Sequence, residues 1–228
     1  MGNPENFSVD IPRRCQMLID ELWPQISEKR DDGSLPLNAS FLLAISTPMI
    51  NLPIERIWKP EMGHAVGHLN DGVLSTRLAE ALRKNIGEQP VCQAPFYQPD
   101  VWRYHYLPKG TGLPDLSQGG LPAEVGAVLE LPAGLAAGAA LTAALFCKIL
   151  RNGLAHGGVL YLDEHGRSTP GAPVQTFCFV STKVKNGKVE GLHFLRVGMK
   201  KYRAFLSFGQ NGFTTNDDGP VSPPHDRL

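Results

Sequence analysis

The sequence lacks paired cysteines and long apolar runs, and these absences exclude several classes of protein. Cys15, Cys92, Cys147 and Cys178 lie far apart and form no Cys-x-x-Cys pair. Because three of them sit inside apolar patterns, buried thiols are favoured over disulfides or a zinc cluster. The longest uncharged stretch, 131–147, is Ala-rich and contains proline and glycine, so it predicts a buried helix rather than a membrane span.

Motifs for nucleotide cofactors and for serine hydrolases are also missing. The chain contains no glycine-rich phosphate loop, no dinucleotide fingerprint and no nucleophile elbow. The first residues have neither a basic start nor an apolar run, so a signal peptide is not predicted. We therefore expect a cytoplasmic protein that uses no cofactor and has no membrane partner.

The content of apolar residues, glycine and proline predicts one globular domain with long irregular connections. The chain has 228 residues, of which 42% are hydrophobic, and this is enough for one sizeable core. The 24 glycines and 19 prolines make up about a fifth of the residues. We expect a single domain over residues 1–208, with a Pro- and Gly-rich insertion at about 88–133 and a disordered tail over 209–228.

The charges balance overall but are unevenly distributed. The 22 Lys and Arg residues match 22 Asp and Glu residues. Between residues 148 and 203, however, ten basic residues stand against three acidic ones, so this segment carries +7 and the rest of the chain −7. A basic third on an acidic body is typical of a surface that binds a polyanion, although the same lysines can equally form the solvated faces of a hairpin and a helix.

Apolar residues at helical spacing predict two helices near the start of the chain. The first begins near Ile11, and Pro24 is expected to kink it or to end it near Trp23. The second is expected from Asn38, which serves as its cap, to just before Pro48.

Two further helices and a short turn are expected before the basic segment. A turn is predicted over 54–58, and a third helix runs from a cap at Asn70 or Asp71 to Gly87. The insertion at 88–133 either holds short strands or covers something functional, because a structureless loop of that length is unusual. A fourth helix is expected over 134–156.

After the fourth helix the apolar period changes from that of a helix to that of a strand. Strands are predicted over 159–162, 175–185 and 188–197, and Asn186-Gly187 between the last two predicts a hairpin turn. A last helix over 199–208 is basic on one side. The pattern therefore predicts a mainly α fold, a helical bundle with an appended C-terminal β-hairpin and a short final helix.

The end of the fourth helix combines a fixed cation, an amide and a titratable ring in Arg151, Asn152 and His156. Asn152 and His156 are four residues apart, so the amide can hydrogen-bond the imidazole and orient it. Arg151 lies about 140° round the helix from His156, and the two converge on one ligand only if the glycines nearby break the helix. This set suits gripping a phosphodiester while moving a proton, unless the three residues merely cap a helix.

The motif resembles that of the HEPN family, whose helical-bundle members carry an Arg-polar-x(3–5)-His motif late in the domain. Many members are ribonucleases that act as toxins or defence effectors. Arg151, Asn152 and His156 match the motif residue by residue, and Arg-Asn-x(3)-His is expected by chance only about 0.016 times in a chain of this composition. The resemblance covers residues 136–208 most closely, looks like a branch found on plasmids and other accessory elements, and implies an HEPN-like bundle.

The resemblance also implies a metal-independent site formed between two chains. On this basis His156 acts as general acid or base, Arg151 clamps the scissile phosphate and Asn152 orients the substrate or binds phosphate. The implied partners are RNA, a second copy of the chain, and an antitoxin or regulatory protein. Small residues over 136–140 would allow close approach of two copies or packing within one chain. The expected RNA-binding residues are Lys148, Lys183, Lys185, Lys188, Lys200, Lys201 and Arg203.

Two other clusters offer alternative sites. His64 and His68, near Glu61, have the spacing of metal ligands, but glycine and proline argue against a helix there and a third ligand is not obvious, so we expect no metal site. His105 lies in an aromatic cluster at 102–106 that either stacks bases or forms a packed strand, and the strand is favoured.

Taken together, these patterns predict a metal-independent endoribonuclease. The alternative is a non-catalytic nucleotide- or RNA-binding module that scaffolds a defence or regulatory complex. A third interpretation, an interaction protein that recruits a partner, is supported only by the insertion at 88–133. The first two are separated by whether Arg151 and His156 converge in one pocket and whether RNA is cut.

Overall fold

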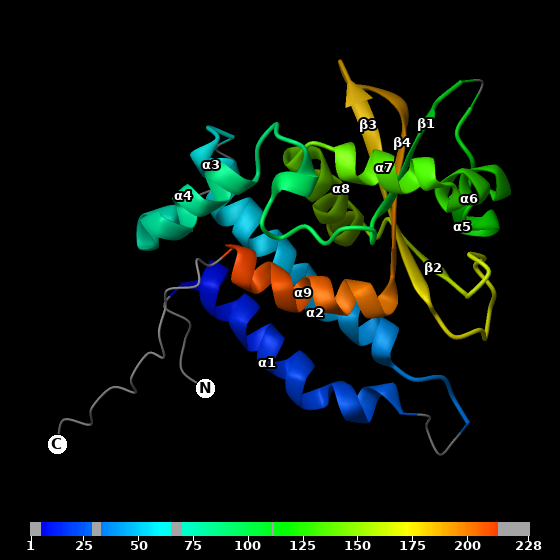
Figure 1. Ribbon diagram of the computed structural model, residues 1–228, viewed down its shortest axis with the longest axis horizontal. Coiled ribbons are helices and arrows are strands. Elements are labelled where there is room, and N and C mark those ends of the chain that lie inside the picture. Colours follow the sequence, from blue (N-terminus) through cyan, green and yellow to red (C-terminus); the bar gives the residue numbers. More distant parts are fainter. Residues whose placement is uncertain (1–5, 29–32, 65–69, 111, 214–228) are drawn as a thin grey trace.

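A computed structural model describes residues 6–28, 33–64, 70–110 and 112–213 (Figure 1). The helical elements in chain order are α1 (Phe7–Ser27), α2 (Asn38–Pro53), η1 (Ile54–Trp58), α3 (Lys59–Glu61), η2 (Asp71–Leu74), α4 (Thr76–Asn85), η3 (Val91–Gln93), α5 (Leu116–Gly119), α6 (Ala123–Glu130), α7 (Pro132–Ala140), α8 (Ala143–His156) and α9 (Met199–Phe213). The strands are β1 (Arg103–Pro108), β2 (Val159–Leu162), β3 (Thr176–Lys185) and β4 (Lys188–Gly198).

The centre of the fold is a four-stranded antiparallel sheet, so the expected mainly α, HEPN-like bundle with one appended hairpin is wrong. The strand order is β1-β4-β3-β2. β1 comes from the Pro-rich insertion and pairs with β4, with Arg103 opposite Arg196, while β2 pairs with β3. The hairpin of β3 and β4 therefore forms the middle of a sheet. Its β4 edge is covered by β1, which is distant in the sequence, and its β3 edge by the short strand β2.

The expected hairpin itself is confirmed. β3 and β4 are joined by Asn186 and Gly187, whose φ angles are 50° and 73°. Two positive φ angles belong to the tight turn whose twist matches that of the flanking strands, and Asn-Gly adopts it at low cost. The insertion at 88–133 holds β1, so the expectation of a short strand in it is also confirmed.

Both faces of the sheet are covered by apolar side chains. On one face Phe177, Phe179 and Leu195 belong to the main core with residues of α1, α2, α8 and α9. On the other face Cys178 and Phe194 pack with α6. Figure 1 shows α1, α2 and α9, which contact one another, on one side of the strands. Because both faces are covered, every residue of β4 from Gly191 to Val197 is buried, including His193 and Arg196.

The first two helices are longer than expected. α1 continues through Pro24 to Ser27, and α2 continues through Pro48 and ends at Pro53. A proline removes one helical hydrogen bond, but Met49 beyond Pro48 is buried in the core. Tertiary packing therefore outweighs the local preference of proline here.

The third and fourth helices are each divided in two. η2 is a 3₁₀ turn, and α4 then begins with the Ser75 hydroxyl accepting from the backbone N–H of Leu78. The expected helix over 134–156 is interrupted after α7, and Thr142 caps the start of α8 by accepting from Leu145 N–H. The small residues over 136–140 thus lie on α7 and not on the helix that carries the motif.

The remaining expectations concern the cysteines, the tail and the membrane. Cys15, Cys147 and Cys178 are buried and Cys92 is exposed, all four as free thiols, which confirms the expectation of buried thiols. α9 extends to Phe213, and the rest of the expected tail, 214–228, lies outside the described residues. Within the part of the chain that the structure describes, we find no single helix of the length and apolarity that crossing a membrane would require.

Candidate functional site

The motif residues lie on the last two turns of α8, which continues without a break to His156. Gly153 is inside the helix, where a Cβ atom would lie 3.1 Å from the carbonyl oxygen of Gly158 and 3.2 Å from the Phe179 side chain. Gly157 ends the helix in the left-handed conformation, with φ of 68°. These glycines therefore serve close packing of α8 on β3 and helix termination, and the break that would bring Arg151 and His156 together is absent from this segment.

Arg151 and Asn152 are hydrogen-bonded to each other, and among the described side chains neither is hydrogen-bonded to His156. Nη1 of Arg151 donates to Oδ1 of Asn152 at 2.8 Å, and Nδ2 of Asn152 donates to the Ser181 hydroxyl at 2.9 Å. Both polar groups of the Asn152 side chain are thus used by Arg151 and by β3. The expected hydrogen bond from Asn152 to the described His156 ring is absent, so that expectation is wrong.

The guanidinium of Arg151 is also paired with a carboxylate that the motif does not reveal. Nε of Arg151 contacts Oε1 of Glu55, which lies on η1. The same carboxylate binds Nζ of Lys59 at 2.8 Å. Glu55 is therefore the shared counter-ion of two cations from different parts of the chain.

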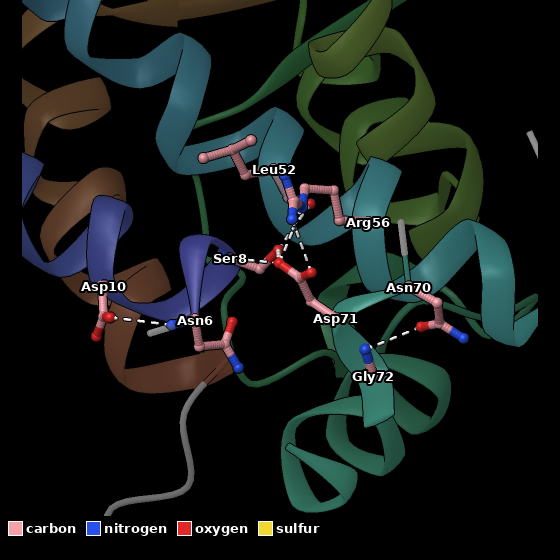
Figure 2. A network of polar contacts seen from close by, with 8 residues as sticks. All are labelled: Asn6, Ser8, Asp10, Leu52, Arg56, Asn70, Asp71 and Gly72. Carbon is pink, nitrogen blue, oxygen red and sulfur yellow. Dashed lines mark hydrogen bonds and ion pairs between the residues drawn. The ribbon is translucent and has the colours of Figure 1, made fainter. Parts of the chain in front are cut away.

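The π-helical turn η1, which carries Glu55, is held in place by the neighbouring residue Arg56. Figure 2 shows Arg56 and Ser8 converging on Asp71, which is only 4% exposed. Arg56 donates to both carboxylate oxygens at 2.9 Å, and the Ser8 hydroxyl donates to one of them at 2.8 Å. Burial opposes ionisation, but these hydrogen bonds outweigh it, and the pKa of Asp71 is lowered.

Two hollows open on either side of Asn152. The arginine hollow has a volume of about 710 Å³, and its lining includes Trp58, Lys59, Leu145, Lys148, Arg151 and Asn152. The histidine hollow has a volume of about 590 Å³, and its lining includes Asn152, His156, Gly158, Val180, Ser181 and Thr182. Arg151 and His156 therefore line different hollows within one chain, and Asn152 is the motif residue that belongs to both.

His193, a buried residue of β4, is not part of any motif identified in the sequence. His193 is 7% exposed and lies opposite Ser181 in the sheet, with its Nδ1 hydrogen-bonded to the Tyr104 hydroxyl at 2.8 Å. Burial, helped by the positive charges of Lys183 and Lys148, lowers the pKa of His193 to about 4. The strand alternation carries a signal for it, because His193 shares a face with the core residue Leu195.

The expected RNA-binding residues fall into separate groups. Lys148 is exposed in the arginine hollow. Lys183 pairs with Glu190 at 3.2 Å, and the exposed Lys185 and Lys188 flank the hairpin turn.

The basic residues of α9 lie at the opposite end of β4. The exposed Lys200 and Lys201 follow the end of that strand, about 30 Å from the hairpin turn at 3.3 Å per residue. The guanidinium of Arg203 lies 4.4 Å from the centre of the Trp23 ring on α1. The structure therefore does not bring these three residues to either hollow.

The alternative clusters are also placed. His64 lines the arginine hollow, and His68 lies outside the described residues. No group of three His, Cys, Asp or Glu side chains in the described ranges is arranged to hold a metal ion. His105 lies in the packed strand β1, as expected for the aromatic cluster.

The chain was also compared with known proteins. No protein-family model, no curated protein and no solved structure matches it.

Proposed function

We propose that the protein binds RNA through the arginine hollow and the adjoining lysines of the hairpin. The observation that carries this proposal is that Lys59, Lys148 and Arg151 line one hollow whose wall also contains the indole of Trp58. Cations beside an aromatic surface are what a phosphate-bearing strand with stackable bases requires.

The positive charge continues from the hollow to the hairpin. Lys148 on α8 and Lys183 on β3 both lie close enough to His193 to lower its pKa. A polyanion that enters the hollow is therefore attracted along a path from α8 to Lys185 and Lys188.

Binding is favoured over cutting by the placement of the motif. Arg151 and His156 line separate hollows, and the Arg151 guanidinium already contacts Glu55. A phosphodiester held by Arg151 of one chain is thus not presented to His156 of that chain. The resemblance to HEPN proteins rests on the sequence over 136–208 with its three motif residues, and not on the fold.

The proposal is tested by fluorescence anisotropy with a labelled single-stranded RNA. Replacing Lys148 and Arg151 together with Ala should weaken binding by about tenfold or more, because two charge-assisted phosphate contacts are lost. The matched control replaces Lys200 and Lys201 with Ala, which removes the same charge from exposed positions at the far end of β4. Absence of RNA binding by the wild type, or an equal loss in the control, would overturn the proposal.

We propose cleavage as a second function, for which a second copy of the chain must supply Arg151 beside His156. The observation in its favour is that His156 is exposed and lines a hollow with Asn152 and Ser181, so a phosphodiester can approach it. RNA cleavage should then persist in EDTA, spare DNA and be lost in His156→Ala, and light scattering should show a dimer. Intact RNA after prolonged incubation with the wild type, or a clean monomer that still cuts, would exclude the composite site.

A further inference from the structure

We propose that the arginine hollow holds one nucleotide unit in a fixed direction, and that its phosphate displaces Glu55 from Arg151 and Lys59. This inference rests on the proposed RNA binding and names the group that the hollow takes. The base lies against Trp58, and the phosphate lies among the cations.

The hollow is polarised along α8. At the start of this helix Ala144 N–H donates to the carbonyl of Gly87, and the Trp58 indole N–H donates to the neighbouring carbonyl of Ile86 at 2.8 Å. Trp58 is therefore fixed by its ring edge at the N-terminal end of α8. There the hollow is also lined by Ala144 and Leu145, with Thr142 and Glu88 beside them, so this end presents an aromatic and apolar surface next to one carboxylate.

The other end of the hollow is cationic. Lys148 and Arg151 follow one and two turns further along the same face of α8, and Lys59 reaches this end because it shares the Glu55 carboxylate with Arg151. Ala144 and Arg151 are about 10 Å apart along the helix axis. The apolar and cationic ends are thus separated by about the length of one nucleotide.

Glu55 pairs with two of the cations that a phosphate in the hollow would bind. A carboxylate is planar and a phosphate is tetrahedral, but both present negatively charged acceptor oxygens. Both therefore form charge-assisted hydrogen bonds with Arg and Lys. Lys148 is exposed and has no ion-pair partner among the described side chains, so it adds a third cation for an incoming group with more charge than Glu55. Glu55 keeps Arg151 and Lys59 together until the phosphate arrives and competes with it for them.

The experiment compares three probes by calorimetric titration: adenosine 5′-monophosphate, ribose 5-phosphate and adenosine. Glu55→Gln should bind the two phosphates about tenfold more tightly and adenosine unchanged, because only a phosphate competes with the carboxylate. The matched control is Glu190→Gln, which removes the partner of Lys183 on the hairpin and should leave all three affinities unchanged.

Trp58→Leu tests the other end of the hollow. It should weaken adenosine 5′-monophosphate and adenosine about tenfold and leave ribose 5-phosphate unchanged, because only a base stacks on the indole. Wild-type tryptophan fluorescence supplies a reading that does not depend on the folding of this variant. The two ligands that carry a base should quench it, and ribose 5-phosphate should not.

Each failure has a separate meaning. If wild-type protein binds RNA but Glu55→Gln binds the phosphates no more tightly, the inference is overturned and Glu55 only positions Arg151. Equal weakening of all three probes in Trp58→Leu, or quenching by ribose 5-phosphate, overturns the assigned direction. Absence of binding to RNA and to every probe overturns the proposed function as well.

Discussion

Two buried polar side chains, His193 and Asp71, connect parts of the chain that are distant in the sequence. His193 joins β4 to Tyr104 of β1, and Asp71 joins the start of α1 at Ser8 to Arg56 of η1. A buried polar group stabilises a fold only when its partners are present, so each of these residues makes the arrangement of its neighbours specific.

The first prediction concerns the acid sensitivity that His193 confers. Because the pKa of His193 falls to about 4 in the folded chain, the unfolded state binds a proton first as the pH drops from 6.5. The stabilisation is complete above pH 6.5 and is lost as the pH falls toward 4, by up to about 3 kcal/mol. Urea unfolding at several pH values should show that His193→Gln removes this loss, while the exposed His165→Gln keeps it. An unchanged pH dependence in His193→Gln would assign the acid sensitivity to other groups.

The second prediction concerns Asp71. Asp71→Asn leaves the Arg56 guanidinium, which is 21% exposed, without its anion and should lower the free energy of unfolding by about 2 kcal/mol at neutral pH. Since the pKa of Asp71 is lowered, the wild-type advantage is present above its ordinary value of 3.8 and disappears as the pH falls through the lower, folded value. Chemical unfolding of both proteins measures it, with the exposed Asp20→Asn as control. Equal stability at neutral pH would show that the cluster in Figure 2 contributes nothing net.

At the scale of the elements, the turn of the hairpin could be predicted from neighbouring residues, whereas the pairing of distant strands could not. Asn186-Gly187 specifies its hairpin within a few residues, and the structure contains that hairpin. The sheet could not be predicted, because Arg103 and its partner Arg196 are far apart in the sequence and β1 is only half-buried along its length. The helix end expected before Pro48 is wrong, because Met49 beyond it is buried in the core and this packing offsets the local cost of the proline.

The third prediction concerns the packing of α7 on β1. At Gly138 an added Cβ would overlap the Trp102 carbonyl oxygen just before β1, so Gly138→Ala should destabilise the fold by about 3 kcal/mol. Gly126 is the matched control on α6, because a Cβ there meets only the Leu121 side chain at 3.8 Å. Gly126→Ala should be neutral or stabilising by about 0.5 kcal/mol. Urea unfolding compares the two, and a stable Gly138→Ala would mean that α7 does not lie on β1.

At the scale of the whole molecule, the net charge of a segment can be counted from the sequence, but the surface on which each charge lies cannot. Asn152 of the motif lines both hollows. Glu55 could not be predicted from the motif, because the Arg151–Glu55 contact joins α8 to η1, which is distant in the sequence. The basic segment also overstates the free positive surface. Arg196 is already paired with Glu130, and the lysines of α9 lie at the end of the sheet opposite the hairpin. Charge counted along a chain is divided among separate surfaces once the chain folds.

The last prediction separates those surfaces by their response to salt. Replacing Lys183, Lys185 and Lys188 with Glu should weaken RNA binding and lower the slope of log affinity against log salt by about 2, since each lost phosphate contact on a single strand accounts for about 0.7. The comparable reversal of Lys200 and Lys201 should leave the slope unchanged, because these residues lie about 30 Å away at the other end of β4. Anisotropy titrations over a range of salt concentrations measure both. If the hairpin variant kept its affinity and slope, the hairpin lysines would be a solvated edge, and RNA binding would depend on the arginine hollow alone.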